Sequence, residues 1–138
     1  GSDDTWAAAV LVTPSTAATT PDALAAWLRR ELRDRLVASG RFDGTAWTAE
    51  PDSAREGTCV RYRLATIDRH ASRPDGSTGV MTLDEHGLAC EVAVPRPSAV
   101  IAKMSWRGEA GAAPASLGLL ADAWLADVEV KGAPAKSR

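Results

Sequence analysis

The sequence has few residues of the types that most often carry chemistry. Its 138 residues include two histidines, two cysteines, one tyrosine and one phenylalanine, and only three of the sixteen basic residues are lysine. No Gly-x-Ser-x-Gly, Cys-x-x-Cys or P-loop pattern occurs, so there is no local signature of a nucleophile, a redox pair or a phosphate cradle. The sequence therefore predicts no catalytic residue, no metal site and no cofactor.

Long hydrophobic runs and an excess of one charge are also missing. The longest apolar stretch, Trp6–Val12, is far shorter than the roughly 20 residues that span a bilayer. A formal net charge of -2 gives no general attraction to phosphate backbones or anionic lipids. We therefore expect no nucleic-acid partner, and membrane association only through a lipid anchor outside this sequence.

The composition, 45% hydrophobic and 25% charged, is that of one globular domain. We expect this domain to cover residues 6–130. Residues 1–5 are expected to be a remnant of cloning or of a cleaved leader, and residues 131–138 a disordered tail.

The clearest element is a helix that follows the short apolar strand Trp6–Thr13. Thr20 is a suitable N-cap and Pro21 suits the first helical position, while Gly40 can end the helix in a left-handed conformation. Between them, leucines recur every four residues from Leu24 to Leu36, which is the period of one helix face.

Strands and turns fill the middle of the chain, and a second helix begins after Pro114. The stretch 41–48 reads as a weak strand, 58–69 and 99–107 alternate well, and 79–94 is either a hairpin or one long bulged strand. The order β-α-β-β-β-β-α predicts an α+β two-layer sandwich, with a mostly antiparallel sheet of four to five strands and both helices on one face. The expected core is Leu24, Leu28, Leu32, Phe42, Val60, Tyr62, Leu64, Val92, Val100, Met104, Leu120 and Trp124.

The two cysteines lie in segments that both read as strands, so a Cys59–Cys90 disulfide is possible. Strand alternation argues against the bridge, because Cys59 shares a face with Arg61 whereas Cys90 shares one with the apolar Val92. A bulge or a strand end at Cys59 would permit it. A bridged pair predicts an exported protein, and free thiols predict a cytoplasmic one.

The best-formed candidate for binding is a strand lined with arginines. Arg61, Arg63 and Arg69 lie on the side of the strand that faces away from the predicted core, and Arg55 and Arg73 flank it. Such a surface would recognise an acidic partner or phosphate. The alternative is that the arginine stems cover apolar surface while their charged heads stay in water.

Two further candidates rest on tryptophan and histidine. Trp6 and Trp47 fall outside the predicted core and would serve a small-ligand or glycan-binding module. His70 and His86 lie in predicted turns and would belong to a small hydrolase only if distant residues complete its site.

A resemblance gives the leading interpretation. The helix ends in Leu32-Arg33-Asp34-Arg35-Leu36-Val37-Ala38-Ser39-Gly40-Arg41-Phe42, after the strand Ala7–Val12. This pattern resembles small bacterial envelope lipoproteins and the amino-terminal domain of TolB-type periplasmic proteins, in which a strand-rich half and a closing helix follow. The resemblance implies a non-enzymatic domain in the periplasm or at the inner face of the outer membrane, which binds another envelope protein through a sheet edge or the arginine-lined strand.

Overall fold

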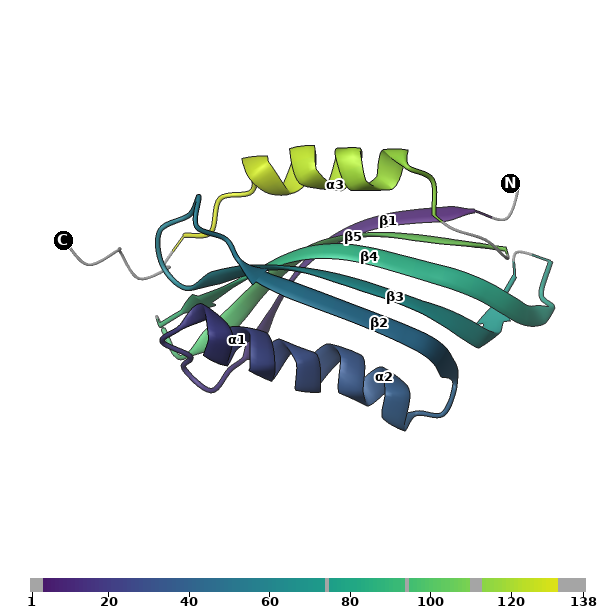
Figure 1. The fold of residues 1–138 in the computed structure, drawn as a ribbon, viewed down its shortest axis with the longest axis horizontal. Helices are drawn as coiled ribbons and strands as arrows, with labels where there is room; N and C mark the ends of the chain where they lie inside the picture. Colours follow the sequence, from purple (N-terminus) through teal and green to yellow (C-terminus); the bar gives the residue numbers. More distant parts are fainter. Residues whose placement is uncertain (1–3, 74, 94, 110–112, 132–138) are drawn as a thin grey trace.

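Five antiparallel strands form one sheet in the order β1-β5-β4-β3-β2, in a computed structural model that describes residues 4–73, 75–93, 95–109 and 113–131. The expected leader remnant and tail therefore lie largely outside the described residues. The strands are β1 (Thr5–Pro14), β2 (Phe42–Pro51), β3 (Cys59–Ser72), β4 (Thr78–Val92) and β5 (Ser98–Glu109). With one helical segment after β1 and another after β5, the α+β class and the predicted order are confirmed (Figure 1).

The first helical segment begins and ends where the sequence predicts. It runs through α1 (Pro21–Leu28), a π-helical stretch η1 (Arg29–Asp34) and α2 (Arg35–Ala38). The hydroxyl of Thr20 accepts a hydrogen bond from the amide of Ala23, at 3.1 Å. Gly40 has a φ of 71°, the left-handed conformation that ends a helix at low cost for glycine.

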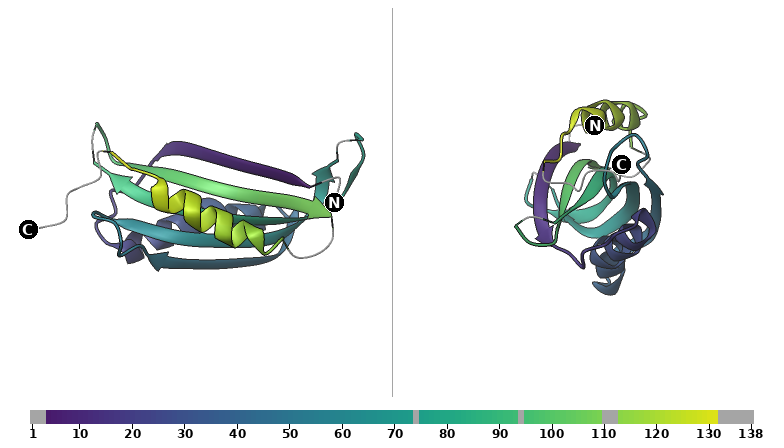
Figure 2. Two further views of the ribbon diagram at one scale, coloured as in Figure 1. Left: turned by 90° about the horizontal axis from the view of Figure 1, so that it is seen from above. Right: turned by 90° about the vertical axis from the view of Figure 1, so that its left-hand side faces the viewer.

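The two helical segments cover opposite faces of the sheet, which corrects the expectation that they share one (Figure 1). Val60, Tyr62 and Ala89 pack with α1, whereas Leu88 and Cys90 pack with α3 (Ser116–Asp127). The end-on view of Figure 2 shows the curved sheet between them. The reason is that the central strands carry apolar residues at both parities, so each face needs its own cover.

The segment that the sequence left open as a hairpin or one long strand forms a single long strand, β4. Asp84-Glu85-His86-Gly87 reads as a turn in the sequence but lies at the centre of β4, paired with β3 on one side and β5 on the other. The predicted turn location of His86 is therefore wrong. Tyr62 of β3 helps to hold this stretch in the strand, because its ring fills the space above Gly87 and its hydroxyl donates to Glu85 at 2.8 Å.

Candidate functional site

An apolar groove lies between the edge strand β1 and the helix α3. It encloses about 450 Å³. Its lining residues are Trp6, Ala7, Ala8, Met104, Leu120, Ala123, Trp124 and Asp127. Trp6 and Ala8 are opposite Trp106 and Met104 in the pairing of β1 with β5, which places their side chains on the α3 face of the sheet.

The groove exposes large apolar side chains that folding usually buries. Trp6 is 43% exposed and Leu120 is 53% exposed, while Trp124 is half-buried. Asp127 is the only charged residue in the described lining. Such a surface favours apolar contact, with a single acceptor group at its border.

The edge of the sheet next to the groove is apolar as well. Val10 and Val12 of β1 are 59% and 65% exposed. Within the described part of the chain, β1 pairs with β5 alone, so its outer side is a sheet edge. Unpaired strand edges of this kind accept a further strand through backbone hydrogen bonds.

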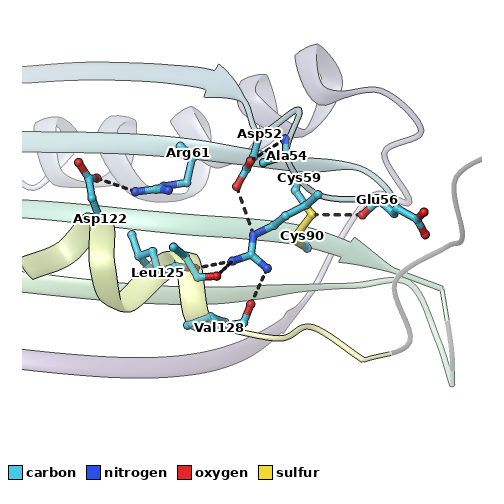
Figure 3. Close-up of polar contacts among 11 residues, drawn as sticks. Asp52, Ala54, Glu56, Cys59, Arg61, Cys90, Asp122, Leu125 and Val128 are labelled. Carbon is cyan, nitrogen blue, oxygen red and sulfur yellow. Dashed lines mark hydrogen bonds and ion pairs between the residues drawn. A yellow bond between two sulfur atoms is a disulfide. The ribbon is translucent and has the colours of Figure 1, made fainter.

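Arg55 fixes the helical wall of the groove. This residue lies in the loop between β2 and β3, and its guanidinium donates to the backbone carbonyls of Leu125 and Val128 at the end of α3. Figure 3 labels these two acceptor residues, close to Cys59 and Cys90. Its Nε also donates to Asp52 at 3.2 Å. The carbonyls at a helix C-terminus lack intrahelical partners, so Arg55 both caps α3 and holds it against the sheet.

A disulfide between Cys59 and Cys90 anchors the same end of α3. The two residues are direct neighbours in the pairing of β3 with β4, with their Cα atoms 4.1 Å apart. Leu125 packs against them. The alternation argument placed the two cysteines on opposite faces of the sheet, and this was wrong. Cys59 and Cys90 lie on the same face, which α3 covers and which carries buried apolar side chains as well as Arg61.

The five predicted arginines are spread over several sites rather than one open surface, and each forms an ion pair within the chain. The pairs are Arg55 with Asp52, Arg61 with Asp122, Arg63 with Asp84, Arg69 with Asp43 and Arg73 with Glu109. These carboxylates compensate much of the positive charge that an acidic partner would meet. An acidic partner at this strand stays a prediction.

His86 lines a small polar pocket of about 180 Å³ beneath the start of α3. Its Nε2 lies 3.5 Å from Oδ1 of Asp84, which Arg63 also contacts. Burial lowers the pKa of His86 below its usual value, and the charge of Asp84 offsets this only in part. No serine, threonine or cysteine is among the described lining residues, and His70 is exposed on β3. A hydrolase stays a prediction.

The second tryptophan candidate, Trp47, lies away from the groove. Its ring stacks on Tyr62 with 5.2 Å between centroids, on the face that α1 covers. Trp6 alone of the two candidates lines the groove. The helix residues Leu120 and Trp124 were expected in the core, whereas α3 buries Leu117, Ala121 and Leu125. The sequence signal that could have revealed this is that apolar residues occur on all sides of α3, which has more leucines than one packed face needs.

Comparisons with known proteins add no relative. No family model, no curated protein and no solved structure matches the chain. None of the described helices is long and apolar enough to cross a membrane. The disulfide favours an oxidising compartment and hence an exported protein.

Proposed function

We propose that the chain is a non-enzymatic binding domain of the bacterial cell envelope, which takes up an apolar segment of another envelope protein in the groove between β1 and α3. The observation that carries this proposal is the exposure of Trp6 and Leu120 on either side of a groove whose helical wall is anchored. Half-exposed aromatic and aliphatic side chains in a concave site are typical of protein interfaces.

The lining indicates the chemistry of the partner. With seven apolar side chains and one carboxylate, the groove suits an inserted aliphatic or aromatic side chain, next to a hydrogen-bond donor or a basic group that reaches Asp127. The periplasm and the inner face of the outer membrane are both compartments in which the Cys59–Cys90 bridge would persist.

Two adjacent leucines of α3 provide a matched test. Leu120 lines the groove, whereas Leu119 is 75% exposed and lies outside the lining. A photo-crosslinking amino acid at position 120 should give a defined protein adduct in cells that express the protein naturally, and the same amino acid at position 119 should not.

The partner identified in this way then allows a quantitative measurement. We expect Leu120→Glu to weaken its binding by on the order of 10- to 100-fold, since a buried leucine contributes roughly 1.5–3 kcal/mol. Leu119→Glu should leave the affinity unchanged. Equal adducts at both positions, or equal losses of affinity, would contradict a role for the groove.

A small apolar ligand is the second candidate, because two indole rings, those of Trp6 and Trp124, line the groove. A fluorescent naphthalene sulfonate is a suitable probe. If the groove takes small apolar molecules, the probe should bind with one site per groove and lose most of its affinity in Trp6→Ala, whereas Val37→Ala, at an exposed position of α2, should have no effect.

A further inference from the structure

The two edges of the sheet differ in how they are protected against pairing. The β2 edge has a register shift between Asp43 and Ala46, a left-handed glycine at Gly44, and the charged Glu50 followed by Pro51. These are the devices that stop another strand from adding to a sheet. The ten residues of β1 have no charge, no glycine and no register shift in their pairing with β5, and the one proline is the last residue.

We propose that two copies of this chain pair through their β1 strands, antiparallel, into one ten-stranded sheet with Ala9 at the two-fold axis. A two-fold axis perpendicular to the sheet is the symmetry that joins two identical edges in this way. It keeps side chains of the same parity on the same face, so the register is fixed by which residue lies on the axis.

The residue sizes along β1 favour Ala9 as the centre. The facing pairs, first copy to second, are then Thr5–Thr13, Trp6–Val12, Ala7–Leu11, Ala8–Val10 and Ala9–Ala9. The aromatic Trp6 faces the β-branched Val12 and the two threonines face each other, which are favourable cross-strand combinations. Ala7 and Ala8 leave room for the larger Leu11 and Val10, and only the pair on the axis, Ala9–Ala9, joins two small residues.

The neighbouring registers are less favourable. With Ala8 on the axis, Val12 would face the carboxylate of Asp4 of the second copy. With Val10 on the axis, Trp6 would face Pro14, which has no amide hydrogen to donate. Ala9 as the centre pairs nine residues of each strand with neither mismatch.

Pairing in this register covers the exposed apolar residues of β1 that the groove does not use. Val10 and Val12 are the most exposed large residues of the strand, and both gain a facing side chain from the second copy. Trp6, Ala7 and Ala8 also line the groove, so Val12, Leu11 and Val10 of the second copy would lie along the β1 border of each groove. The pairing itself needs only the strand edge, so the dimer does not depend on the function proposed for the groove.

Sedimentation velocity measures the first consequence. The oxidised chain should sediment as a dimer in reversible equilibrium with the monomer, from low-micromolar concentrations upward. Val10→Lys should raise the dissociation constant at least about tenfold, because the two lysines are diagonal neighbours across the axis on the same face of the sheet and their ammonium groups repel each other. Val80→Lys, at an exposed position of β4, is the matched control and should leave the constant unchanged.

A cysteine at three successive positions of β1 tests the register and does not rely on the lysine variant folding. Ala9→Cys should oxidise rapidly to a covalent dimer, because its two copies face each other directly, whereas Ala8→Cys and Val10→Cys should crosslink at least about tenfold more slowly. The native sulfurs are buried and should not exchange. A monomer at all concentrations, a dimer that Val10→Lys leaves intact, or fastest crosslinking at position 8 or 10 would each overturn the proposal.

Discussion

Removal of the Cys59–Cys90 bridge offers a quantitative test of how much this disulfide stabilises the fold. The two cysteines are 31 positions apart in the sequence, so the bridge closes a loop of about that length in the unfolded chain. Loop-closure entropy for this length corresponds to about 3.7 kcal/mol at 25 °C. For a chain of 138 residues, a loss of that size lowers Tm by about 13 °C.

The assay compares the oxidised protein with Cys59→Ala/Cys90→Ala in urea, followed by tryptophan fluorescence. The free energy of unfolding should fall by about 3–4 kcal/mol, and wild-type protein unfolded and refolded in reductant should show a similar loss. If the double variant loses less than about 1 kcal/mol, the bridge does not stabilise the fold through loop closure.

Hydrogen exchange locates the same effect. Leu125 packs on the disulfide, whereas α1 packs on the other face of the sheet. Amides of α3 should therefore lose more protection in the double variant than the fall in global stability explains. Amides of α1 should lose no more protection than that fall explains. Equal acceleration in both helices would refute the view that the bridge anchors α3.

Three further variants probe separate contacts by urea denaturation. Arg55→Ala should cost about 2 kcal/mol, because it leaves carbonyls at the end of α3 without a donor, and a loss below about 0.5 kcal/mol would show that water replaces it. Gly87→Ala should cost about 1–3 kcal/mol, since the new methyl carbon would lie 2.1 Å from Cε1 of the buried Tyr62 ring. Burial raises the pKa of Asp68, but the hydrogen bonds from Arg41 and the His70 amide, together with the charges of Arg41 and Arg107, bring this pKa below its usual value, so the contribution of Asp68 to stability is present above the usual value of 3.8 and is lost as the pH falls through the lowered value. Asp68→Asn should therefore destabilise the protein at pH 7 much more than at pH 2, and a penalty that is equal at both pH values would contradict this.

Local signals in the sequence were sufficient for the first helix and for β3. The cap at Thr20, the four-residue leucine period and the glycine at position 40 are set by neighbours in the chain, and the structure confirms them. Alternation in β3 identified Val60 and Tyr62 as core residues, which are fully or almost fully buried. These features depend on short-range geometry, which a single sequence contains.

Contacts between distant segments account for what the sequence did not predict. Alternation gives the parity of a strand but not which faces are covered, so Cys59 was assigned to an open face that α3 in fact covers. The same limit applies within α3. Spacings through Leu120 and through Leu125 both satisfy the helical period, and only packing on Cys90 decides that Leu125 is buried and Leu120 lines the groove.

The groove and the β1 edge have a joint consequence if two copies pair as proposed. A two-fold axis perpendicular to the sheet leaves both α3 helices on the same side, so both grooves open toward one partner surface. A partner that presents two apolar segments would then bind both grooves, and the second contact would form at a high effective concentration. Val10→Lys would weaken binding to such a partner although Val10 is not among the residues that line the groove, whereas Leu120→Glu would weaken binding to isolated segments as well.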